Sequence, residues 1–189
     1  MEAFLVSITT ISVAEIGDRT QLLSLVLAAR YRRPWPIIAG ILCATLANHA
    51  VAGLIGVWFG SLLKPHTLDL VVGVSMIAMA LWTLKPDKLD ENTGAHSATG
   101  AFLATLTSFF IAEIGDKTQI ATLALAAAYP SLIAVVAGTT AGMMIANVPV
   151  VFLGKAFANR LPLKAIHYGA AVLFVVLGAL FIARGLWES

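Results

Sequence analysis

A phrase of eight residues that carries two acids, a glycine, a basic residue and a hydroxyl occurs twice in this chain. The first copy runs from Ala14 to Gln21 and the second from Ala112 to Gln119. Over residues 14–31 and 112–129, 12 of 18 positions are identical at a constant offset of 98. Each copy lies within an apolar stretch, where an ionised side chain costs about 2.5–3.5 kcal/mol at mid-depth of a bilayer and so marks a functional site.

The motif acids are hard oxygen ligands of the kind that bind divalent cations. They are Glu15, Asp18, Glu113 and Asp116. On a continuous helix, residues three apart share a face, so Glu15, Asp18 and Gln21 would form one ladder that the second copy repeats. Carboxylate and amide oxygens favour Ca²⁺, Mn²⁺ or Mg²⁺ over zinc or copper. We therefore predict one metal site, with supporting or gating roles for the other polar motif residues: Arg19, Thr20, Gln21, Lys117, Thr118 and Gln119.

The charges of the motif predict a coupling between metal and protons. The two copies carry four acids and two bases, which leaves a net charge of minus two if all six are ionised and close together. One divalent cation or two protons would neutralise it, so we expect the four acids to take up protons when no metal is bound. Gly17 and Gly115 permit an unwound turn that frees backbone carbonyls for a cation.

A simpler alternative is that each motif neutralises itself. Each Glu could pair with the basic residue four positions later on its own helix, which would leave no need for a ligand. This arrangement leaves Asp18 and Asp116 unpaired, and it gives no reason for both copies to retain Thr and Gln.

A few further polar residues lie within apolar stretches. Asn48 and Asn147 occupy matching places in the two halves and are either neutral ligands or partners in interhelical hydrogen bonds. His49 has no counterpart, because Val148 stands opposite, and we expect it to be packed or hydrogen-bonded rather than a ligand. Asp69 lies near the end of an apolar stretch and is expected at the interface.

The composition identifies the elements that must position these residues as membrane-spanning helices. The chain is 59% hydrophobic and only 12% charged, with a mean hydropathy of +0.91. Its net charge of +2 is too small to indicate a nucleic-acid partner. The apolar runs do not alternate as barrel strands do, so the fold class is an all-α membrane protein. Six runs reach the length of about 17–25 residues that crosses a bilayer: 4–29, 36–60, 67–84, 101–127, 131–154 and 165–186.

The two halves of the chain are expected to be inverted repeats. We expect a first three-helix repeat at 1–85, a cytoplasmic linker at 86–100 and a second repeat at 101–189. An odd number of spans in each half makes the second copy enter the membrane from the opposite side. Inverted repeats are common in transporters, where the substrate site lies at mid-depth between them.

The positive charges of the loops predict the orientation. Loops one, three and five hold eight Lys and Arg residues, whereas the opposite face holds Lys64 and Arg184. Basic loops stay in the cytoplasm, so both termini are predicted on the non-cytoplasmic side. The sequence does not indicate an oligomeric state.

The doubled Glu-x-Gly-Asp-(Lys/Arg)-Thr motif in a six-span chain resembles the Gdt-type family of cation/proton antiporters, whose bacterial members include MneA-type manganese exporters. The resemblance covers essentially the whole chain. It implies secondary active export of Mn²⁺, or of Ca²⁺ in some relatives, from the cytoplasm in exchange for protons. It also implies that the motif acids bind the cation, with no resident cofactor, and the short loops favour a bacterial inner-membrane member.

Three other classes of protein share single features with this chain. A passive channel for divalent cations also uses carboxylates, but it would not drive transport uphill. A LysE-like amino-acid exporter would need groups for a zwitterion rather than a symmetric carboxylate cage. Intramembrane aspartyl proteases carry Gly-x-Gly-Asp, whereas Glu stands at the first of these glycines in both copies here. We therefore predict a transporter and not an enzyme.

Overall fold

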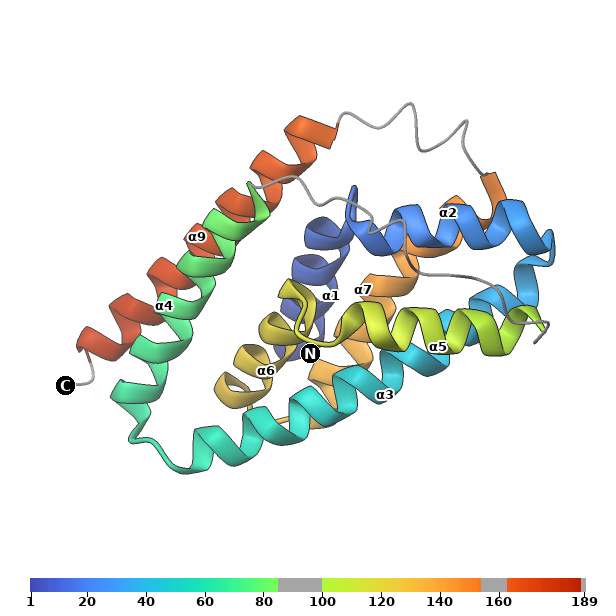
Figure 1. Ribbon diagram of the computed structural model, residues 1–189. Helices are drawn as coiled ribbons and strands as arrows, with labels where there is room; N and C mark the ends of the chain where they lie inside the picture. The colour runs from blue at the N-terminus through green and yellow to red at the C-terminus, as the bar shows by residue number, and fades with distance from the viewer. Residues whose placement is uncertain (85–99, 154–162, 188–189) are drawn as a thin grey trace.

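The computed structural model describes residues 1–84, 100–153 and 163–187, and all the regular structure in them is helical (Figure 1). Most of the predicted linker at 86–100, and the loop residues Lys85, Lys88, Lys155 and Arg160, lie outside the described residues. The helices are α1 (Glu2–Glu15), α2 (Arg19–Tyr31), α3 (Pro34–Ser61), α4 (Pro65–Thr83), α5 (Ala101–Glu113), α6 (Lys117–Ala128), α7 (Leu132–Leu153) and α9 (Leu163–Trp187).

The first and fourth predicted spans are each two helices rather than one. Residues 4–29 divide into α1 and α2, and residues 101–127 divide into α5 and α6. In the part of the chain that the structure describes, three helices are long and apolar enough to cross a membrane: Pro34–Ser61, Leu132–Leu153 and Tyr168–Trp187. The described residues therefore do not form six continuous spanning helices, because the motif interrupts two of the predicted spans and Pro65–Leu81 of α4 is a shorter apolar helix.

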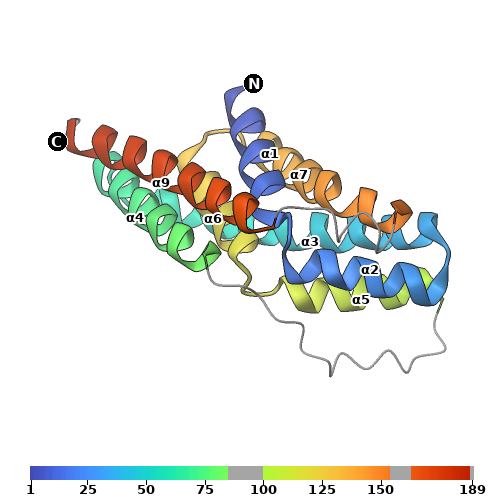
Figure 2. The same ribbon diagram turned by 90° about the horizontal axis from the view of Figure 1, so that it is seen from above.

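Each broken helix packs against the long helix of the other half. The α1–α2 pair lies on α7, and the α5–α6 pair lies on α3 (Figures 1 and 2). Glycines allow these close approaches. A Cβ at Gly142 of α7 would lie 2.8 Å from the carbonyl oxygen of Ile8, and one at Gly40 of α3 would lie 2.8 Å from that of Phe102. The two halves are thus interlocked, which brings the two motifs to one place.

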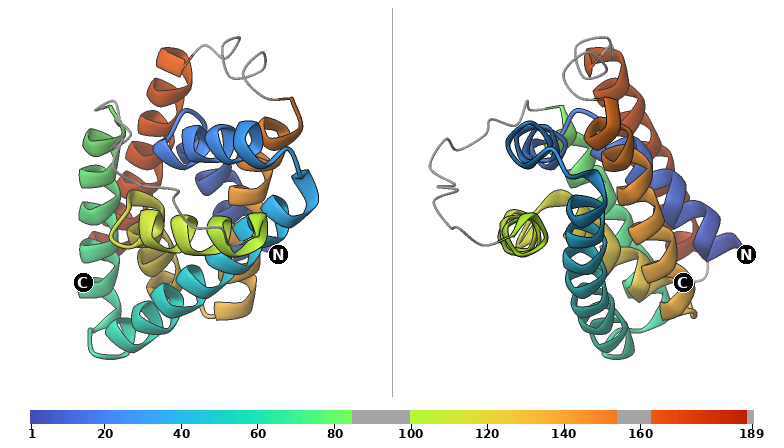
Figure 3. Two further views of the ribbon diagram at one scale, coloured as in Figure 1. Left: turned by 45° about the vertical axis from the view of Figure 1, so that its right-hand side comes forward. Right: turned by 90° about the vertical axis from the view of Figure 1, so that its right-hand side faces the viewer.

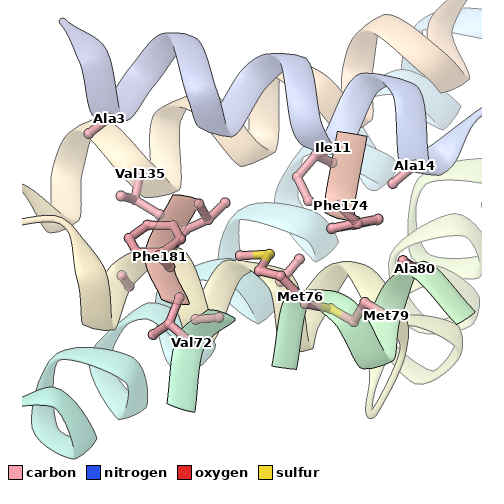
Figure 4. Packing of buried hydrophobic residues seen from close by; sticks show 14 of the residues in the cluster. Ala3, Ile11, Ala14, Val72, Met76, Met79, Ala80, Val135, Phe174 and Phe181 are labelled. Atoms are coloured by element: carbon pink, nitrogen blue, oxygen red, sulfur yellow. The ribbon is translucent and has the colours of Figure 1, made fainter. Parts of the chain in front are cut away.

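The last long helix of each half forms a separate pair, α4 with α9, alongside the interlocked helices (Figure 3). Met76 of α4 and Phe174 of α9 are fully buried, and they form one hydrophobic cluster with Ile11 of α1 (Figure 4). Asp69 is buried and accepts two hydrogen bonds from Arg184, at 2.7 and 2.8 Å. This ion pair joins α4 to α9, and Asp69 lies near the start of α4, so its expected position at the membrane interface stays a prediction.

Candidate metal centre

The two copies of the motif lie at two helix breaks with the same backbone. In the first, α1 ends at Glu15, Ile16 is extended, Gly17 has a φ of +86° and Asp18 precedes α2. In the second, Gly115 has a φ of +75° between Glu113 and Asp116. The predicted unwound turn is confirmed. The prediction of one continuous ladder is wrong, because a left-handed residue separates the two acids of each copy.

The glutamine of each motif closes the break. The amide N–H of Gly17 donates to Oε1 of Gln21 at 2.9 Å, and that of Gly115 donates to Oε1 of Gln119 at 2.7 Å. Gln21 also donates from Nε2 to the carbonyl oxygen of Ala146 at 3.0 Å. Both glutamines therefore hold the backbone that presents the acids, which explains why both copies have one.

Three of the four motif acids meet across the two halves. Glu15, Asp18 and Asp116 are buried, and each offers one oxygen within 4.8 Å of the others. Asp116 comes from the second break, so neither half forms this cluster by itself. Glu113 lies outside this group of three.

The basic residue of each half contacts the motif aspartate of the other half. Arg19 lies 2.9 Å from Oδ1 of Asp116 and donates to the carbonyl oxygen of Ala112 at 2.8 Å, while Lys117 donates to Oδ1 of Asp18 at 2.5 Å. The alternative of two self-neutralised helices is therefore wrong. The aspartates that it left unpaired are the ones that the basic residues contact.

Glu15 has the least protein support of the three clustered acids. Among the described residues neither of its carboxylate oxygens has a hydrogen-bond partner, and the hydroxyl of Thr20 has none either, although both side chains are fully buried. A buried carboxylate without a partner is costly unless a proton or a cation neutralises it. These orphaned oxygens fit a hard divalent cation, which prefers several oxygen ligands.

Both asparagines form interhelical hydrogen bonds. Asn48 donates to the carbonyl oxygen of Phe110 at 3.1 Å, which joins α3 to α5. Asn147 accepts from the hydroxyl of Ser24 at 2.7 Å and donates to the carbonyl oxygen of Met143. These contacts favour the second of the two predicted roles. The sequence pattern did not single out Ser24 as a partner of Asn147. Thr122 stands at its position in the second copy, and the position carries no charge.

Glu113 has a different environment from its counterpart Glu15. Its Oε2 lies 3.7 Å from Nε2 of His49 and 3.4 Å from the hydroxyl of Thr118. His49 comes from α3, the long helix of the first half, and both side chains are fully buried. We expected His49 to be packed or hydrogen-bonded. It is packed, but neither ring nitrogen has a hydrogen-bond partner among the described residues.

This arrangement defines a class of protein: a helical membrane protein with two interlocked repeats whose broken helices bring buried acids together. Inverted repeats with broken helices around a central ion site are typical of secondary transporters. The chain belongs to the family described as "Divalent cation/proton antiporter GDT1", whose model matches residues 3–91 and again residues 101–189. The family resemblance of the doubled motif is thereby confirmed, and the family is one of transporters rather than enzymes.

Relatives that cover nearly all of the chain support this assignment. A protein of Vibrio cholerae named "Putative manganese exporter" is 52% identical over 178 residues, which are 94% of this chain and 88% of the relative. A "GDT1-like protein" of Synechocystis is 29% identical over 194 residues, 92% of this chain and 93% of the relative. No solved structure matches this chain.

Proposed function

We propose that this protein exports Mn²⁺ from the cytoplasm across the bacterial inner membrane in exchange for protons. The observation that carries the proposal is the buried group of Glu15, Asp18 and Asp116, which needs both repeats and leaves the oxygens of Glu15 without a hydrogen-bond partner among the described residues. The choice of Mn²⁺ is supported by the name of the Vibrio cholerae relative. Both termini lie outside the cytoplasm, as the basic loops predict.

The exchange follows from the charge of the site. With Glu113 included, four carboxylates and two basic residues leave a net charge of minus two when all are ionised. Two protons or one divalent cation neutralise this charge equally well. The protonated state of the site and its cation-bound state therefore exclude each other. The cation replaces protons on the acids, and competes with Lys117 and Arg19 for Asp18 and Asp116.

The inverted repeats supply access from both sides. The two breaks approach the same site from different halves of the molecule, so a movement of one half against the other would open the site first to one face and then to the other. The hydrogen bonds of Gln21 and Gln119 keep each break intact during such a movement.

Proteoliposomes containing the purified full-length protein test this function. With equal Mn²⁺ on both sides, an imposed pH gradient should drive Mn²⁺ uphill, and a Mn²⁺ gradient should move protons in the opposite direction. Glu15→Gln should abolish both fluxes, and Glu2→Gln, at the exposed start of α1, is the matched control that should abolish neither. Mn²⁺ flux that only runs downhill indicates a passive channel. Ca²⁺ flux that Mn²⁺ does not inhibit indicates a calcium antiporter.

A further inference from the structure

One buried nitrogen-bearing side chain faces a motif acid at a distance too long for a hydrogen bond. His49 is fully buried at the middle of α3, and neither Nδ1 nor Nε2 has a hydrogen-bond partner among the residues that the structure describes. Oε1 of Glu113 has none either. Leaving buried polar atoms unpaired is costly. Nε2 of His49 faces Oε2 of the same Glu113 carboxylate, and a cation bound between the two side chains would satisfy both.

The distance between the two side chains fits two ligands of one cation better than a hydrogen bond. Nε2 of His49 lies 3.7 Å from Oε2 of Glu113, beyond the range of about 2.7–3.2 Å for a hydrogen bond. Ligand atoms at about 2.1 Å from a metal ion can be up to about 4.2 Å apart. The hydroxyl of Thr118 donates to the same carboxylate oxygen at 3.4 Å.

The position of His49 is also where the two halves differ. Its neighbour Asn48 corresponds to Asn147, but Val148 follows Asn147 and offers no ligand atom. Glu113 therefore has an imidazole beside it, whereas Val148, at the corresponding position of the other half, supplies none. An imidazole nitrogen raises affinity for first-row transition-metal ions, whereas Ca²⁺ and Mg²⁺ are bound by oxygen.

We propose that His49 and Glu113 form a nitrogen-containing coordination position beside the group of Glu15, Asp18 and Asp116. This position makes the protein prefer a transition-metal cation over Ca²⁺ or Mg²⁺. The inference rests on the proposed cation transport and deepens it, because it assigns selectivity to a residue outside the duplicated motif.

Pulsed electron paramagnetic resonance of Mn²⁺ bound to the full-length protein tests this directly. In protein labelled with ¹⁵N-histidine, the Mn²⁺ spectrum should show coupling to a directly bound nitrogen. The coupling should disappear in His49→Gln and persist in His66→Gln, a matched control because His66 contacts Thr67 at the start of α4. Binding measurements should show His49→Gln losing about tenfold or more in affinity for Mn²⁺, with Ca²⁺ affinity changed by less than threefold.

The outcomes separate this inference from the function on which it rests. Mn²⁺ that binds the unaltered protein without histidine coupling overturns the role of His49 and leaves the transport proposal standing. An equal loss of Mn²⁺ and Ca²⁺ affinity in His49→Gln overturns that role as well. If the unaltered protein binds no divalent cation at all, the proposed function fails and the inference fails with it. An absence of histidine coupling in the unaltered protein needs no variant, so poor folding of His49→Gln cannot obscure that result.

Discussion

The two helix breaks have nearly the same sequence and different surroundings. Both have a glycine at positive φ, a glutamine that closes the turn and an aspartate that contacts the basic residue of the other half. The glutamates differ: Glu15 lies in the group of three acids, whereas Glu113 faces His49 and Thr118. A duplicated motif therefore does not make a symmetric site, because the helices packed against each copy have diverged.

The largest expected difference between the breaks concerns their basic residues. Lys117 is 2% exposed at its side chain and Arg19 is 35% exposed. Breaking a buried ion pair costs about 3–5 kcal/mol, whereas an exposed pair contributes about 1 kcal/mol or less. Lys117→Met should therefore lower the free energy of unfolding in detergent by about 3–5 kcal/mol, and Arg19→Met by clearly less. Asp18→Asn combined with Lys117→Met should recover part of the loss. Equal losses for Lys117→Met and Arg19→Met would contradict this burial argument.

The next comparison concerns the two glutamates. Glu15→Gln removes an acid of the three-acid group and should weaken Mn²⁺ binding by about 100-fold, whereas Glu113→Gln should weaken it by about tenfold. Isothermal titration calorimetry on both variants gives the ratio of their Mn²⁺ dissociation constants. Glu113→Gln should also reduce the preference for Mn²⁺ over Ca²⁺, which Glu15→Gln should leave unchanged. A larger effect of Glu113→Gln than of Glu15→Gln would reverse the assignment of the two positions.

The glutamines should differ by less. Gln21 is buried and has a second hydrogen bond, to Ala146 of α7, while Gln119 is half-buried. Losing a buried hydrogen bond costs about 1–3 kcal/mol. Thermal unfolding should therefore show Gln21→Ala to be less stable than Gln119→Ala by about 1 kcal/mol. Indistinguishable melting temperatures would mean that the bond to Ala146 adds no stability.

A similarly small effect is expected at the glycine of the second break. A Cβ at Gly115 would have open space around it, so its φ of +75° is the only obstacle to substitution. Gly115→Ala should therefore cost about 1 kcal/mol, and Gly115→Asn less, because asparagine tolerates this conformation. Thermal unfolding of the two variants checks which of them is more stable. An alanine variant as stable as the wild type would show that the turn can rearrange.

Much of this organisation could be predicted from residue patterns. The exact offset between the motifs indicates a duplication, and the apolar runs indicate helices in a membrane. Glycine between two acids predicts an unwound turn, and the structure confirms it at Gly17 and Gly115. The partners of the basic residues could not be predicted in this way. An i to i+4 pairing is available on any helix, and the break removes it by turning Arg19 and Lys117 toward the other half.

The residue types alone identify the chemistry: four acids, two bases and two glycine turns in an apolar chain indicate a divalent cation as substrate. Which acid meets which base or histidine depends on how the helices of the two halves pack. The interlocking of each broken helix with the long helix of the other half brings Asp116 to Glu15 and Asp18, and His49 to Glu113. The reason is that such contacts join residues about 60–100 positions apart, whose proximity depends on helix packing that no local pattern encodes.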